Sequence, residues 1–172
     1  ERTRHNVGFD IVTRIAERHA AEFRKERFWN ALRGRATLGG ETVTLVLPQS
    51  YVNLTGPVVR KISADLEVVP RDVLVAVDDF WLPLGRIRIR TGGGDGGHNG
   101  LRSLIRALGT EEFPRLRMGI GEPGPGDAVD HVLSRFRAEE REQVKEMIDA
   151  AADAAEVWAV EGPEAAMNRF NG

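Results

Sequence analysis

The sequence contains no cysteine, which excludes disulfide bonds, thiolate metal ligands and a cysteine nucleophile. It also lacks any apolar run near the roughly 18 residues needed to cross a bilayer. No basic and then apolar leader opens the chain, so nothing indicates a membrane or secreted protein. From these absences we expect a cytoplasmic protein.

The composition that is present is typical of a globular domain. Apolar residues make up 41% and charged residues 29% of the 172 residues, which argues against intrinsic disorder. A chain of this length can bury a single core. Because the net charge is −2, a nucleic-acid partner would have to bind a local basic surface.

Apolar spacing alternates along the chain between the periods of helices and strands. Helical spacing is found at about 7–24, 57–66, 101–108 and 138–161, and strand patterns are found at 42–47, 73–77, 86–90 and 115–121. This alternation predicts an α/β fold, a single domain over residues 1–172 with a mixed twisted sheet and helices on both faces. Such folds bind ligands outside the carboxyl ends of strands, where Asp78 and residues 48–53 would lie.

The four histidines are the first candidates for acid–base chemistry. His19 and His131 lie among charged residues and are expected to be solvated, while His5 occupies a helix start. Asp78, at the end of a buried strand, is a natural partner for a histidine base, because a carboxylate fixes the tautomer and stabilises the imidazolium. The pattern is equally consistent with a turn cap formed by Asp78 or Asp79.

Two asparagines and a glycine-rich loop leave further alternatives open. Asn53 and Asn99 each follow a bend or a glycine loop, where asparagine either tolerates unusual backbone geometry or orients a carbonyl or a water. The loop at 92–97 matches the dinucleotide-binding pattern G-x-G-x-x-G. The strand before it alternates arginine and isoleucine, unlike the buried first strand of a nucleotide-binding unit, so a nucleotide-binding domain is the weaker interpretation.

Arginines gather on two of the predicted strands. Arg86, Arg88 and Arg90 share one strand face, and Arg115 and Arg117 share a face of the other. If the two strands are neighbours, these side chains form a phosphate-sized patch near the glycine loop. A solvated sheet face balanced by acidic residues is the alternative.

Five short blocks stand out when the motifs are taken together. They are Thr3-Arg-His-Asn-Val-Gly-Phe9, Pro48-Gln-Ser-Tyr-Val-Asn-Leu-Thr-Gly56, Val75-Ala-Val-Asp-Asp79 with Leu82-Pro-Leu-Gly85, Gly92-Gly-Gly-Asp-Gly-Gly-His-Asn-Gly-Leu101, and Arg115-Leu-Arg-Met-Gly-Ile-Gly121 with Val132-Leu133. In this order they resemble the bacterial peptidyl-tRNA hydrolase family, and the resemblance extends over nearly the whole chain.

The resemblance implies an enzyme, without metal or organic cofactor, that hydrolyses the ester between a peptide and the 3′ ribose of tRNA from stalled ribosomes. His5 matches the family's catalytic base, which deprotonates the attacking water. Asp78 matches the carboxylate that keeps this histidine basic. Asn53 and Asn99 match the amides that bind the 3′ end of the substrate and help to position the substrate and the water.

The resemblance also implies how tRNA is held. Tyr51 matches an aromatic residue that contacts the terminal nucleotide, consistent with base stacking. Arg90 and Arg117 match the two basic positions that clamp the 5′ phosphate. Residues 132–136 would belong to a mobile lid beside the cleft. The implied partner is peptidyl-tRNA, and we expect a monomer.

The chain departs from the family pattern at its start. Family members begin with a strand, a Gly-x-Gly-Asn-Pro-Gly loop and a tyrosine, none of which precedes Thr3 here, and we expect them upstream in a longer protein. Val52 stands where the family usually has methionine, another apolar residue. A non-catalytic RNA-binding relative is the main alternative, although such a protein need not keep both His5 and Asp78.

Overall fold

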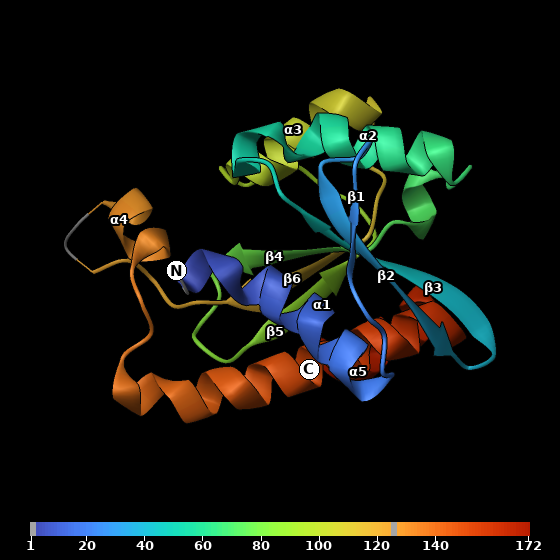
Figure 1. The fold of residues 1–172 in the computed structure, drawn as a ribbon. Helices are drawn as coiled ribbons and strands as arrows, with labels where there is room; N and C mark the ends of the chain where they lie inside the picture. The colour runs from blue at the N-terminus through green and yellow to red at the C-terminus, as the bar shows by residue number, and fades with distance from the viewer. Residues whose placement is uncertain (1–2, 125–126) are drawn as a thin grey trace.

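A computed structural model of the chain describes residues 3–124 and 127–172 (Figure 1). The strands are β1 (Arg24–Glu26), β2 (Ala31–Leu38), β3 (Glu41–Pro48), β4 (Val75–Asp79), β5 (Ile87–Arg90) and β6 (Arg115–Gly119). The α-helices are α1 (Val7–Arg18), α2 (Thr55–Asp65), α3 (Asn99–Leu108), α4 (Ala128–Leu133), α5 (Arg141–Glu161) and α6 (Pro163–Phe170). Short 3₁₀ turns are η1 (Arg4–Asn6), η2 (Val52–Leu54), η3 (Pro70–Asp72) and η4 (Ala138–Glu140).

The strands form two three-stranded sheets. In one sheet β1, β2 and β3 pair antiparallel in that order. In the other, β6 lies between β4, to which it is parallel, and β5, to which it is antiparallel. The predicted α/β class and the mixed strand directions are confirmed, with the strands divided between two small sheets.

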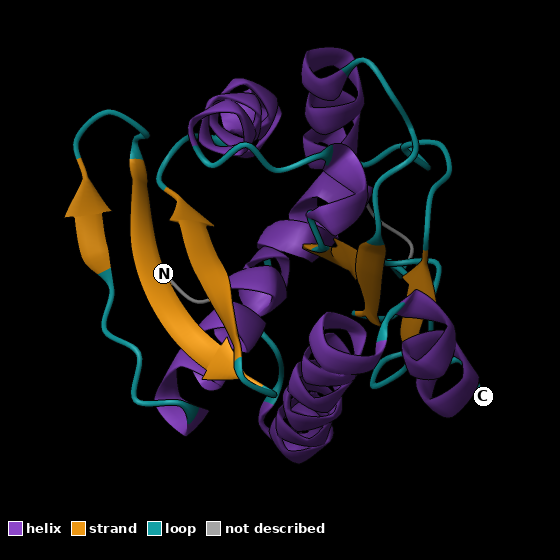
Figure 2. Cartoon of the chain, turned by 90° about the vertical axis from the view of Figure 1, so that its right-hand side faces the viewer, coloured by secondary structure: helices purple, strands orange, loops and turns teal. Residues whose placement is uncertain are grey.

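Helix α1 spans the space between the two sheets (Figure 2). It packs against β3 of the first sheet and β4 of the second. Among the residues that the structure describes, each of these two strands has a neighbouring strand on one side only. The two edges are therefore joined through side-chain packing on α1 and carry backbone groups that no described strand pairs.

The main core lies where α1 meets α5. Val7, Ile11 and Ile15 form the buried face of α1. They belong to the same cluster as the buried alanines of α5 at 151–155, whose small side chains let the two helices approach closely. Helices α2 and α3 lie on the opposite side of the molecule from α5 (Figure 1).

Some element boundaries differ from those expected. The helix predicted at about 7–24 ends at Arg18, because Ala20 adopts a left-handed backbone (φ 50°) and β1 begins at Arg24. Strands β1 and β2 and helix α6 were not predicted, since charged and small residues interrupt the apolar alternation of β2. No helix in the described ranges is both long and apolar enough to cross a membrane.

Candidate active site

The site begins at a single turn, η1, whose sequence fixes its shape. Asn6 accepts hydrogen bonds through its Oδ1 from the backbone N–H of Thr3 (3.0 Å) and from the Thr3 hydroxyl (2.8 Å). The backbone N–H of Asn6 donates back to the Thr3 carbonyl (3.0 Å). These bonds close the turn around the two residues between them, so Arg4 and His5 project in defined directions.

Arg4 anchors this turn to the interior. Its guanidinium is buried and donates to Ser134 Oγ (3.1 Å), to the Ile120 carbonyl (3.0 Å) and to Glu140 Oε2 (2.7 Å). It also lies over the ring of Phe136, 4.6 Å from the centroid. Residues 134–140 are thereby attached to the turn that carries His5.

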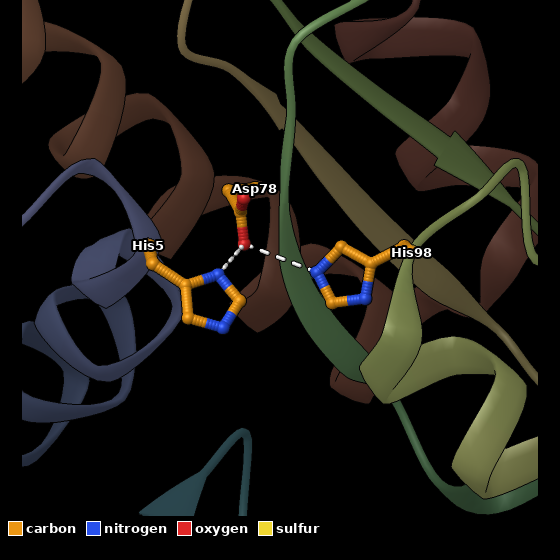
Figure 3. A group of neighbouring side chains, drawn as sticks. All are labelled: His5, Asp78 and His98. Carbon is orange, nitrogen blue, oxygen red and sulfur yellow. Dashed lines mark hydrogen bonds and ion pairs between the residues drawn. The ribbon is translucent and has the colours of Figure 1, made fainter. Parts of the chain in front are cut away.

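A close approach of α1 to β4 brings His5 to the sheet. A Cβ at Gly8 would lie only 2.6 Å from the carbonyl oxygen of Ala76, so no larger residue fits at this contact. His5 Nδ1 then lies 2.6 Å from Oδ1 of Asp78 (Figure 3). Because a carboxylate only accepts, Nδ1 carries the proton and Nε2 of His5 is left as a free base. The predicted pairing of these two residues is present.

His98 is the second partner of the same carboxylate oxygen. Its Nδ1 caps α3, accepting from the backbone N–H groups of Gly100 (3.1 Å) and Leu101 (3.2 Å). The proton must therefore be on Nε2, which donates to Asp78 Oδ1 at 3.1 Å (Figure 3). The helix cap thus fixes His98 as a neutral hydrogen-bond donor to Asp78.

These bonds shift the proton affinities of the pair in opposite directions. Burial raises the pKa of Asp78, but the hydrogen bonds from His5 and His98 outweigh it and lower that pKa to about 2. The hydrogen bond to Asp78 raises the pKa of His5 above 6.5, against the opposing effect of burial. Asp78 therefore remains a carboxylate, and His5 is a stronger base than a free imidazole.

The same three side chains are the described residues that could hold a metal ion. One ligand atom from each of His5, Asp78 and His98 lies within 4.8 Å of the others. A metal would need the lone pair of His98 Nε2, yet that nitrogen carries the proton while Nδ1 caps α3. The donor set therefore fits a hydrogen-bond network better than a metal centre.

Asn53 and Asn99 line one groove, of about 680 Å³, between α2 and α3. Asn99 directly follows His98 at the start of α3, and Asn53 lies in η2, which packs against that helix end. Tyr51, the residue before η2, is 82% exposed, so its ring is open to a ligand. The structure thus places the two asparagines in one groove that begins next to His98, while Tyr51 is exposed and outside the groove lining.

Helices α2 and α3 touch at Gly56 and Ser103, and Ser103 is one of the residues that line this groove. The backbone N–H of Gly56 donates to Ser103 Oγ at 3.0 Å. A Cβ at Gly56 would lie 2.1 Å from the Ser103 carbonyl oxygen, so only glycine permits this approach. Long side chains further along both helices line the groove.

The predicted arginine patch lies on one face of the second sheet. Arg88 stands opposite Arg117 and Arg90 opposite Arg115 across β5 and β6, so all four side chains start from the same face. Arg90 is exposed. Arg117 Nε forms an ion pair with buried Asp79 (2.7 Å), a contact that sequence reasoning did not foresee.

Arg115 does not belong to the exposed patch, which corrects the expectation that grouped it there. It is buried, and its guanidinium donates to the carbonyl oxygens of Gly93 (2.6 Å), Gly94 (2.9 Å) and Glu111 (3.0 Å). Arg115 therefore holds the glycine loop, which leads directly to His98 and Asn99.

Sequence reasoning missed the roles of His98 and Arg115. His98 lies inside one of the five sequence blocks, immediately before the predicted Asn99. Its role as a hydrogen-bond donor arises only because the glycine loop folds back onto Asp78. The period-two pattern grouped Arg115 with Arg117, and a pattern along one strand does not show which arginine is covered by a loop from elsewhere.

Comparisons with known proteins agree with one another. A family profile described as peptidyl-tRNA hydrolase matches residues 1–172. A peptidyl-tRNA hydrolase of Chloroflexus aggregans is 47% identical over 172 residues, covering 99% of this chain and 91% of the relative. One from Clostridium novyi is 40% identical over 172 residues, covering 100% and 91%. The crystal structure of peptidyl-tRNA hydrolase from Acinetobacter baumannii matches with a TM-score of 0.93 at 34% identity, covering 99% of this chain and 87% of that one.

Proposed function

Because the chain belongs to the peptidyl-tRNA hydrolase family and hydrolyses the peptide–tRNA ester, which recycles tRNA, we propose that His5 is the general base of this reaction. The observation that carries the proposal is the 2.6 Å contact between His5 Nδ1 and Asp78 Oδ1. It commits one ring nitrogen to the carboxylate and leaves the other free to accept a proton.

The chemistry follows from this geometry. Nε2 of His5 takes a proton from water as the water oxygen attacks the ester carbonyl, and Asp78 stabilises the imidazolium that forms. The tetrahedral intermediate then collapses, the ribose oxygen leaves, and the imidazolium returns its proton to that oxygen. The products are a peptide carboxylic acid and tRNA with a free 3′ end, and the base is restored.

The asparagines have two roles in this proposal. Asn53 and Asn99 bind the 3′ end of the substrate and help to position it and the attacking water. Their shared groove beside His98 supports this assignment. An amide N–H directed at the developing oxyanion would lower the barrier further, because its dipole is already oriented before the reaction.

The contacts to tRNA are proposed on exposed Tyr51 and Arg90 and on half-buried Arg117. Tyr51 stacks on the terminal nucleotide, which its open ring supports. Arg90 and Arg117 bind the 5′ phosphate. Arg117 uses Nε for Asp79, so its terminal Nη groups are the ones that would reach the phosphate.

The wider setting is also a proposal. We expect the enzyme to act as a cytoplasmic monomer without a cofactor. We further propose that the complete domain includes a strand upstream of Thr3 that pairs with β3 and β4, whose unpaired edges support this. Intact mass tests it, since a native protein of 19.0 kDa has no room for the additional strand.

Single-turnover hydrolysis of an N-blocked aminoacyl-tRNA tests the function. The parent protein should release the amino acid, and His5→Ala should reduce the rate by about 10²–10⁴-fold while tRNA still binds. His19→Ala is the matched control, because His19 lies at the far end of α1, where its Nε2 is 3.3 Å from a carboxylate oxygen of Glu156. Equal rates for the His5 variant and the parent would rule out His5 as the base.

A further inference from the structure

The groove between α2 and α3 extends well beyond the two asparagines. Along α3 its lining runs from Asn99 to Ala107. The eight residue steps between them span about 12 Å of helix, enough for about three stacked nucleotides at about 3.4 Å each. The groove therefore continues away from His98 over a length that the ester itself does not require.

Cations form the walls of this groove. Arg60 and Lys61 contribute from α2, and Arg102 and Arg106 from α3, while no described carboxylate lines it. Lys61 pairs with Asp65 (3.1 Å) and Arg102 with Asp95 (3.3 Å) just outside the groove.

The remaining two cations are available for a ligand. Within the described part of the chain, neither Arg60 nor Arg106 forms an ion pair with a carboxylate. Both side chains are exposed, and they face the groove from different helices. Two exposed guanidinium groups that form no ion pair, on opposite walls of one groove, make a site for an extended anion, since guanidinium is well suited to phosphate. Arg106 also interacts with Asp95 through space, outside the groove lining.

We propose that this groove binds the sugar–phosphate backbone of the single-stranded 3′ end of the RNA, immediately before the ribose that carries the ester. The proposal rests on the proposed function, which places the ester beside Asn53 and Asn99. The strand must leave the site from there, and this groove begins at those residues. A peptide lacks the regular negative charge that Arg60 and Arg106 would complement.

The test compares two substrates that carry the same ester but differ by two upstream nucleotides and their phosphates. One is an N-acetyl-aminoacyl ester of a single nucleoside, and the other carries the same ester at the 3′ end of a trinucleotide. The parent enzyme should have the lower KM for the trinucleotide ester. Combined Arg60→Ala and Arg106→Ala substitutions should reduce that preference by about two- to fivefold for each arginine, the range expected for exposed charge pairs.

Salt dependence supplies a second measurement. The slope of log kcat/KM against log salt should become less steep by about 0.7 for each lost phosphate contact to a single strand. Arg141→Ala is the matched control, because Arg141 is exposed at the start of α5, on the opposite side of the molecule from the groove (Figure 1). The preference of Arg141→Ala for the trinucleotide ester and its salt slope should equal those of the parent.

Two results would overturn the groove assignment. One is an unchanged preference for the trinucleotide ester in the double variant, and the other is an equal loss in Arg141→Ala. Failure of the parent to cleave any ester would instead count against the proposed function. Binding of the unesterified trinucleotide, measured by fluorescence anisotropy, then decides the groove separately: weaker binding by the double variant supports it and equal binding refutes it.

Discussion

Asp78 and Asp79 are neighbours in the chain, yet their side chains project from opposite faces of β4. Asp78 accepts from His5 and His98, whereas Asp79 pairs with Arg117. One strand end therefore supplies a carboxylate to the candidate base on one face and a carboxylate to the candidate phosphate clamp on the other.

The dependence of activity on pH should report the bond between Asp78 and His5. His5 acts as a base only when it is neutral, and the hydrogen bond to Asp78 raises the pKa of His5. The acid limb of kcat/KM in the parent should therefore lie above pH 6.5. Asp78→Asn removes the carboxylate but leaves burial, so the pKa of His5 falls and the limb moves to lower pH.

Asp78→Asn should also lower the high-pH plateau of kcat/KM by about 10²–10⁴-fold, because no carboxylate then fixes the tautomer of His5 or stabilises its imidazolium. Profiles of kcat/KM measured between about pH 5 and 9, a range that spans the ordinary histidine pKa, check both effects. An acid limb that stays in place would show that Asp78 does not set the basicity of His5.

Two substitutions separate the two hydrogen-bonding roles of His98. Asparagine is a good helix N-cap, so His98→Asn should preserve the start of α3 while losing the bond to Asp78. His98→Ala should lose both and destabilise the fold by about 1 kcal/mol more. Thermal unfolding reports the loss of the helix cap, and kcat reports the loss of the hydrogen bond to Asp78. A parental kcat in His98→Asn would mean that this bond contributes nothing to the reaction.

The two arginines of the candidate clamp should respond differently to removal. Arg90→Ala removes an exposed side chain, so tRNA binding should weaken and its salt slope should decrease by about 1 without loss of stability. Arg117→Ala also leaves the buried Asp79 carboxylate without its cation, which should cost about 1–3 kcal/mol in the free energy of unfolding. Chemical denaturation and binding titrations at several salt concentrations distinguish the two. An unchanged salt slope would remove Arg90 from the clamp.

Gly56 should be intolerant of even one added methyl group. Gly56→Ala places a Cβ against the Ser103 carbonyl and should push α2 away from α3, at a cost of about 1–3 kcal/mol. Gly94→Ala is the control, because no atom lies within 4 Å of a Cβ at that position. Urea denaturation of both variants gives the comparison, and equal stabilities would show that the helices separate without cost.

Local patterns in the sequence supported the α/β class and most strands, whereas the pairing of His5 with Asp78, 73 residues apart, was expected only from the family resemblance. The sequence could not supply contacts made by loops that return from a distance. His98 reaches Asp78 from twenty residues away, and Arg115 reaches back to Gly93. The division into two sheets was equally hidden, since strand patterns do not state which edges meet.

The anchoring of Arg4 sets an order for assembly of the site. His5 is synthesised well before its scaffold is complete, because its neighbour Arg4 bonds to residues 116, 130 and 136 positions later in the chain. Contacts of such sequence separation close late in folding. A nascent chain that ends before Glu140 holds His5 and Asp78 but lacks part of the scaffold that orients the histidine. Catalytic competence should therefore appear only after the ribosome has delivered most of the domain.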